Sequence, residues 1–251
     1  MRARVWFFDL DNTLHDATHA SYAGINEGMT SYIVEQLGVT SAEAGALRQR
    51  YWQRYGATLL GLIRHHGVQP GHFLHHAHRL PGLEERVYGH AHDLHVLRRL
   101  ARLPGRRCIL TNAPAAYTAR VLGALGIAPL FHAVLSIEDM RMFGQWRPKP
   151  DARMLARMAV RLRANPRDCV LVEDTLEHQK AARGVGMRTV WMQRWLRPAA
   201  SGPRPPGMLG ATANGASKSP RVGAAPHKRP AAGRPAYVDR RIRRLGELLR
   251  R

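Results

Sequence analysis

Two acidic residues, Asp9 and Asp11, stand at the end of an apolar run in the segment VWFFDLDNTLHD (residues 5–16). A carboxylate can attack phosphorus to form an aspartyl phosphate, and a second carboxylic acid can protonate the leaving alkoxide. Residues two apart on a strand face the same way, so these acids would repel each other unless a cation lay between them. The pair predicts a magnesium ion and a phosphate here, with Asp9 as the attacking group. An acid pair taken alone also fits a solvated loop.

A second acid pair, Glu173 and Asp174, ends another apolar run in VLVEDT. Magnesium prefers oxygen ligands and takes few protein carboxylates, because it keeps waters and substrate phosphate in its shell. We therefore expect Asp9, the backbone carbonyl of Asp11, and Asp174 to be the metal ligands.

Three further residues could bind or stabilise a phosphate. Thr111 and Asn112 end CILTNAP just before a helix that starts near Pro114, and a helix N-terminus with a nearby hydroxyl is an anion site. Lys149 lies between two prolines in RPKP, where it could neutralise a phosphoryl oxygen or the charge of the nucleophile. Each also has an ordinary interpretation, since Thr and Asn are common capping residues and most lysines are solvated.

Apolar runs without polar alternation precede several of these residues. Such runs are typical of strands buried on both faces of a parallel sheet, and we expect these strands to position the candidate residues. Helical patterns separate several of them, so we predict a doubly wound, Rossmann-like α/β core over residues 1–16 and 96–197. The candidate residues fall at the C-terminal ends of strands or in the loops that follow, where open parallel sheets bind ligands. The runs are 5–10, 108–111, 133–137, 169–173 and 189–192.

Residues 17–95 show helical periodicity and a capping box from Thr40 to Glu43, which predicts an all-helical cap that can close over the site. The segment YGATLLGL (55–62) could recognise a substrate, with Tyr55 stacking on a base, or could equally begin a helix with packing aromatics. Nine of the 14 histidines lie between residues 65 and 95. Four of them could offer zinc ligands at helical spacing or face solvent: His72, His75, His76 and His78.

The C-terminal part has two kinds of sequence. Of the 38 residues from 198 to 235, 23 are Ala, Gly or Pro and none is aromatic, which predicts a disordered insertion. Residues 236–251 regain an apolar pattern, and we expect a strand and a helix there that return to the core.

The formal net charge is +21, and residues 199–251 carry 12 Lys and Arg against two Asp and Glu. Such a surface attracts nucleic acid or small anionic substrates.

Cys108 and Cys169 lie in apolar runs and predict no disulfide framework, hence a reducing compartment. With no signal-like start and no run near the ~18 apolar residues of a membrane span, we expect a soluble cytoplasmic protein without a membrane partner.

The order acid pair, Thr, Lys, acid pair resembles the haloacid dehalogenase superfamily of phosphohydrolases over about residues 4–195. DLDNT is similar to its first motif and EDT to its fourth, and the helical insert is similar to its C1 cap. The resemblance implies a Mg²⁺ cofactor and a role for each candidate residue. Asp9 would be the nucleophile, Asp11 the general acid and base, Thr111 and Lys149 the phosphate and charge stabilisers, Asp174 a metal ligand, and Glu173 a support for Lys149.

Asp11 favours a phosphatase over a dehalogenase, because an alkoxide leaving group needs a proton and a halide does not. Within the superfamily the motifs most resemble bacterial pyrimidine 5′-nucleotidases, which implies a magnesium-dependent pyrimidine nucleoside 5′-monophosphate phosphatase. Two alternatives stay open. One is a phosphatase for another small metabolite, such as phosphoglycolate or a sugar phosphate, and the other is a nucleic-acid-binding protein that uses its basic tail. The sequence leaves the oligomeric state open.

Overall fold

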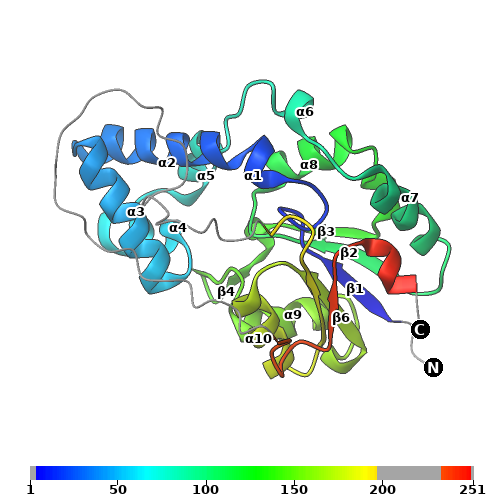
Figure 1. Cartoon of the computed structure of the whole chain (residues 1–251). Helices are drawn as coiled ribbons and strands as arrows, with labels where there is room; N and C mark the ends of the chain where they lie inside the picture. Colours follow the sequence, from blue (N-terminus) through cyan, green and yellow to red (C-terminus); the bar gives the residue numbers. More distant parts are fainter. Residues whose placement is uncertain (1–3, 197–232, 250–251) are drawn as a thin grey trace.

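The computed structural model describes residues 4–196 and 233–249, which form an α/β fold around a six-stranded parallel sheet of order β3-β2-β1-β6-β7-β8 (Figure 1). The predicted α/β core is confirmed. The order reverses between β1 and β6, so the crevice at their carboxyl ends is the expected place for a ligand. The strands are β1 (Val5–Phe8), β2 (Arg106–Leu110), β3 (Ala133–Leu135), β6 (Cys169–Glu173), β7 (Arg188–Met192) and β8 (Arg240–Ile242).

The register of the central strands brings their polar ends to one edge. Phe8 stands opposite Val172, and the backbone N–H of Asp9 still donates to the carbonyl of Val172 at 3.0 Å. Asp9, Thr111 and Glu173 therefore lie at the same carboxyl edge of β1, β2 and β6. The sequence predicted these strands because apolar runs are typical of strands buried on both faces of a sheet. Because the buried runs exclude polar residues, the polar residues lie together where the strands end.

Alternate strand residues face two separate apolar layers. Phe8 packs in a cluster with side chains of α7 (Ala91–Leu100) and α8 (Ala115–Ala124), while Phe7 packs with α9 (Ala152–Arg161) and α10 (Leu176–Gly184). Figure 1 shows these helix pairs on opposite faces of the sheet. Cys108 and Cys169 are both fully buried in the second layer, and burial raises the pKa of their thiols to about 11 and about 12.

Residues 17–95 all lie in the described part and form helices without a strand; the helices of residues 22–77 gather at one end of the molecule, whereas residues 83–95 lie over the sheet (Figure 1). The capping box is present, with the backbone N–H of Thr40 donating to Glu43 Oε2 at 2.8 Å. Gly61 lets two helices pack, because a Cβ there would overlap the ring of Tyr51. The helices before α7 are α1 (Ala17–Ala20), α2 (Tyr22–Leu37), α3 (Ser41–Tyr55), α4 (Thr58–His66), α5 (Pro70–Ala77) and α6 (Leu83–Arg86).

A short hairpin that the sequence did not predict links the core to this helical part. Strands β4 (Arg141–Met142) and β5 (Gln145–Trp146) pair antiparallel, and Phe143 and Gly144 make the turn with φ of 51° and 75°. Trp146 and the nearby Ile137 pack in the apolar cluster of the cap helices. The remaining elements are 3₁₀ helices at Ala128–Leu130 (η1), Ile137–Asp139 (η2), Pro166–Asp168 (η3) and Leu245–Leu249 (η4).

The C-terminal residues lie against the core. β8 pairs in parallel with β7, and the predicted helix that follows it is the 3₁₀ helix η4. The backbone N–H of Leu245 donates to Asp93 Oδ1 at 2.9 Å, which joins η4 to α7. The expected disorder of residues 198–235 concerns a segment that, up to residue 232, lies outside the described residues.

Asp93 also forms an ion pair with Arg194, whose Nε lies 2.7 Å from Asp93 Oδ2. The side chain of Asp93 is 6% exposed, so losing its cation leaves a buried carboxylate. We expect Arg194→Ala to lower the free energy of unfolding by about 3 kcal/mol. The matched Arg161→Ala, in an ion pair whose arginine is 50% exposed, should cost no more than about 1 kcal/mol. Urea unfolding of both variants measures this, and equal losses would contradict it.

Candidate active site

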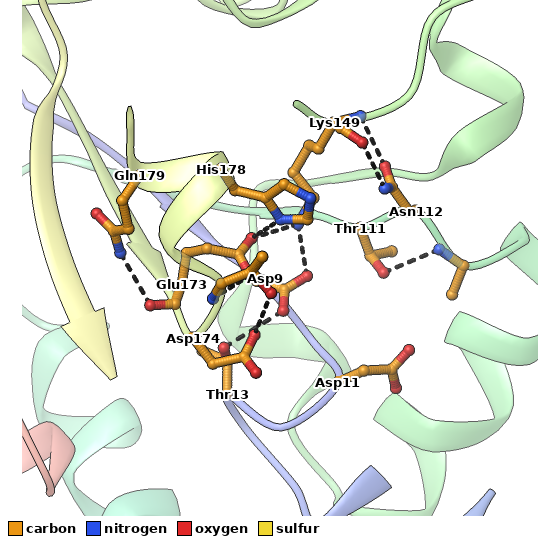
Figure 2. Close-up of polar contacts among 12 residues, drawn as sticks. Asp9, Asp11, Thr13, Thr111, Asn112, Lys149, Glu173, Asp174, His178 and Gln179 are labelled. Carbon is orange, nitrogen blue, oxygen red and sulfur yellow. Dashed lines mark hydrogen bonds and ion pairs between the residues drawn. The ribbon is translucent and has the colours of Figure 1, made fainter. Parts of the chain in front are cut away.

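Asp9, Lys149 and Glu173 meet at the carboxyl edge of β1 and β6 (Figure 2). Lys149 Nζ donates to Asp9 Oδ1 at 2.7 Å and to Glu173 Oε2 at 2.6 Å. The second oxygen of Asp9 accepts from the hydroxyl of Thr13 at 3.3 Å. All four side chains are buried, so the structure holds the Asp9 carboxylate at both of its oxygens.

The charges of this cluster shift one another's pKa values. Burial disfavours the charged form of Lys149, but the carboxylates of Asp9 and Glu173 outweigh it and raise the pKa of the ammonium. Burial also opposes ionisation of Glu173, yet Lys149 and His178 hold its pKa well below the ordinary value. Glu173 is therefore the ionised partner of Lys149. Burial and, after it, the Glu173 charge instead outweigh Lys149 and raise the pKa of Asp9 to about 8.

Asp174 adds a third acid beside this pair. Carboxylate oxygens of Asp9, Glu173 and Asp174 lie within 4.8 Å of one another, and they form the one group of possible metal ligands found within residues 4–196 and 233–249. Burial and the charges of Glu173 and Asp9 raise the pKa of Asp174 well above its ordinary value. A hard divalent cation would relieve this repulsion, and an all-oxygen donor set fits Mg²⁺. The residues present therefore fit the metal.

Glu173 is a member of this group of possible ligands, whereas the sequence predicted the backbone carbonyl of Asp11 as the third ligand beside Asp9 and Asp174. Its Oε2 already accepts from Lys149, and its Oε1 accepts from the backbone N–H of Thr175 at 3.2 Å. Asp174, whose Oδ1 accepts from the Thr175 hydroxyl at 3.3 Å, is thus the acid with more capacity for an ion, while Asp9 and Glu173 both pair with Lys149.

Thr111 and Asn112 follow β2 and approach the same edge. Thr111 is 1% exposed, and its hydroxyl accepts from the backbone N–H of Ala113 at 3.0 Å, which leaves its own proton to donate. The Asn112 amide forms two reciprocal hydrogen bonds with the main chain of Lys149, each 2.9 Å. The sequence assigned Asn112 to the substrate, whereas the structure uses its side chain to hold Lys149 in place.

Asp11 lies apart from the acid cluster, as Figure 2 shows. We expected Asp9 and Asp11 to face the same way on a strand, and this was wrong because β1 ends at Phe8 and the chain turns. The Asp11 carboxylate instead accepts from Tyr117 and pairs with His15, each at 2.8 Å. Its hydrogen-bond partners are therefore different from those of Asp9.

Sequence reasoning missed several side chains at this edge. His178 Nδ1 lies 3.1 Å from Glu173 Oε2, and Gln179 donates to the carbonyls of Glu173 and Val190 at 2.8 and 2.7 Å. The position of His178 and Gln179 in the first turns of α10, directly after the second acid pair, was the available signal. Tyr117 gave none, because its partner is 106 residues away.

The cap segment 55–62 reaches the site at one point. A Cβ on Gly56 would lie 3.6 Å from the Pro150 ring, next to Lys149. The hydroxyl of Tyr55 contacts His65 Nε2 at 2.6 Å, and the guanidinium groups of Arg54 and Arg64 lie 5.5 and 5.9 Å from its ring centre. The turn at Gly56 therefore borders the segment that carries Lys149, while the Tyr55 ring is already flanked by two guanidinium groups.

The cap histidines fall outside the group of possible metal ligands in the described residues. His72 and His76 pack edge-on against the ring of Tyr32, and His78 against that of Tyr117. Their contacts are those of packing side chains, so the structure lends no support to a zinc site there. Within the described residues, no helix is both long and apolar enough to cross a membrane.

Comparison with known proteins gives one family and a consistent fold. Residues 3–186 match the profile of haloacid dehalogenase-like hydrolases. A HAD phosphatase from Thermococcus onnurineus is 17% identical, with a TM-score of 0.58 over 98% of this chain and 95% of that one. A HAD family hydrolase from Deinococcus radiodurans with bound phosphate and sodium is 21% identical, with a TM-score of 0.51 over 98% and 93%. At sequence identities this low, the likeness to these two structures shows a shared fold and nothing more.

A curated relative matches a shorter stretch. Phosphate metabolism protein 8 of Saccharomyces cerevisiae is 33% identical over 61 residues, which are 24% of this chain and 19% of that protein. The chain thus spans about a fifth of the length of this relative.

Proposed function

Because the chain belongs to the haloacid dehalogenase-like hydrolases, we propose that it hydrolyses phosphate monoesters through an aspartyl phosphate on Asp9. The observation that carries this proposal is the buried cluster at the strand-order reversal, where Lys149 Nζ lies 2.7 Å from Asp9 Oδ1 and Asp174 stands beside them. A fixed carboxylate next to a cation suits attack on phosphorus, since the lysine also offsets charge on the transferred group.

The reaction follows from two acids with separate partners. An oxygen of Asp9 attacks phosphorus while the bond from phosphorus to the substrate oxygen breaks, and Asp11 gives that oxygen its proton. Asp11 then takes a proton from water as the water oxygen attacks the phosphorus of the acyl phosphate. Inorganic phosphate leaves and both carboxyl groups return to their starting state.

Asp9, Asp174 and the main-chain carbonyl of Asp11 would hold the magnesium ion, which supplies positive charge against the phosphoryl oxygens. The raised pKa values of Asp9 and Asp174 support this assignment, because a cation would favour both ionised forms. The bound phosphate and sodium in the Deinococcus radiodurans relative fit the same interpretation of the site.

For the substrate we propose a pyrimidine nucleoside 5′-monophosphate, on the resemblance of the motifs to bacterial pyrimidine 5′-nucleotidases. The Gly56 turn lies against Pro150, so a cap residue is close enough to the site to contact a bound ester. The excess of positive charge favours any small anionic ester. A cytoplasmic location, with both buried thiols reduced, agrees with this function.

Phosphate release from a panel of monophosphates, with Mg²⁺ or with EDTA, tests the proposal. The panel should contain pyrimidine and purine nucleotides, phosphoglycolate and a sugar phosphate. We expect release that needs Mg²⁺, with kcat/KM for pyrimidine nucleotides at least about tenfold above the others, as a pocket fitted to one base allows. Preference for phosphoglycolate or the sugar phosphate would overturn the proposed substrate but not the phosphatase activity. No release from any ester by folded, Mg²⁺-loaded protein would refute the phosphatase.

A further inference from the structure

Both recorded contacts of the Asp11 carboxylate are made to the same oxygen. The hydroxyl of Tyr117 donates to Asp11 Oδ1 at 2.8 Å, and His15 Nε2 lies 2.8 Å from that oxygen. Within the described residues, no partner is recorded for Oδ2. The side chain of Asp11 is 17% exposed, so Oδ2 can reach solvent or substrate. The two oxygens therefore have different surroundings.

Tyr117 is a fixed donor. It is 1% exposed, and its phenol, a donor at neutral pH, lies 2.8 Å from an oxygen that can only accept. Its oxygen also lies 2.8 Å from the hydroxyl of Ser21, which is 2% exposed and also contacts the carbonyl of Ala17 at 3.1 Å. Because the Asp11 carboxylate can only accept, Tyr117 directs its proton at Asp11, and the single proton of Ser21 is left for the Tyr117 oxygen or the Ala17 carbonyl.

His15 contacts the same oxygen from the loop after β1 and has little freedom. It is fully buried, and its backbone forms an isolated bridge with that of Asp11 four residues earlier. With Nε2 protonated, the ring donates to Oδ1 as Tyr117 does. Two donors from different elements, one in the loop after β1 and one in α8, thus fix the orientation of a single carboxylate.

We propose that Tyr117 and His15 are positioning residues that hold Asp11 by Oδ1, so that Oδ2 is the oxygen that gives and takes the proton. This rests on the proposed phosphatase function, in which Asp11 is the acid and base. Ser21 extends the network to the start of α2, so the orientation of Asp11 depends on both the core and the cap.

Tyr117→Phe tests this directly, because it removes one oxygen, and the Ser21 proton can then go to the Ala17 carbonyl. The readout is kcat/KM, which reports transfer to Asp9, for a nucleoside monophosphate and for p-nitrophenyl phosphate. The alkoxide of the first needs a proton, and the acidic phenol of the second does not. We expect a loss of about 10- to 100-fold for the nucleotide, and less than about threefold for the aryl ester.

A residue that only supports the fold would lower both rates alike. Tyr32→Phe is the matched control, since Tyr32 is another buried tyrosine whose hydroxyl meets a histidine, His72, within the cap. His15→Gln, which keeps a donor, should retain more nucleotide activity than His15→Leu. In an Asp11→Asn background, Tyr117→Phe should cause no further loss, because the group it positions is gone.

The outcomes distinguish the positioning role of Tyr117 and His15 from the proposed phosphatase function. If the wild type releases phosphate and Asp11→Asn shows the leaving-group pattern, but Tyr117→Phe lowers both esters equally or neither, the positioning role is wrong and the phosphatase stands. If the wild type cleaves neither ester, the function fails and the positioning role falls with it.

Discussion

Asp9→Asn is expected to lower phosphate release by about 10⁴-fold or more, because enzymes that lose their nucleophile fall toward the rate left by binding alone. The amide has the shape of the carboxylate but cannot form the acyl phosphate. Steady-state release of phosphate from the best ester, with saturating Mg²⁺, measures the loss. Asp168→Asn, at the other end of β6, is the matched control and should keep wild-type activity.

Asp9→Asn should not lower the stability of the folded protein. The pKa of Asp9 is raised to about 8, so in the absence of metal its ionisation opposes folding increasingly as pH rises from about 4 to about 8. The neutral amide lacks this penalty. In EDTA, the unfolding temperature of Asp9→Asn relative to the wild type should therefore rise across that range. An inactive but less stable variant at every pH would indicate a structural role for Asp9.

Lys149→Met is expected to have the largest effect on stability. It leaves the Glu173 carboxylate buried without its cation, beside Asp9, and breaking such a buried pair costs about 3–5 kcal/mol. Activity should fall by about 10²- to 10³-fold even where the variant is folded, since a preorganised charge at the reacting group is lost. Urea unfolding and phosphate release on the same sample separate the two effects.

Lys180→Met is the matched control, because Lys180 is exposed on α10. It should change stability by no more than about 0.5 kcal/mol and leave phosphate release unchanged. A Lys149 variant as stable and active as the Lys180 variant would show that the buried cluster has no energetic role.

The strand positions could be predicted because each is a short apolar run that the sheet buries on both faces. β6 begins and ends as expected, and β1 stops two residues early, at Phe8. That small difference had a large consequence. Once the strand ends, the two-residue alternation no longer applies, so Asp11 turns away from Asp9 toward His15 and Tyr117.

The candidate site was predictable where its residues follow strands directly, as Asp9, Thr111 and Glu173 do. What each residue contacts was harder to foresee. Asn112 had the residue type of a phosphate ligand, yet its amide matches the main chain of Lys149, 37 residues away. The hairpin of β4 and β5 has two residues per strand, too few to show alternation in a sequence.

The covalent intermediate on Asp9 is the central claim, and its direct detection is the decisive measurement. Asp11→Asn protein is mixed with p-nitrophenyl phosphate and Mg²⁺, quenched in acid, digested and examined by mass spectrometry. The account predicts a phosphoryl group on the peptide that contains Asp9, since the aryl ester needs no acid and the acyl phosphate lacks its base. Asp9→Asn protein should carry none. Release of p-nitrophenol without any phosphorylated peptide, at every quench time, would contradict it.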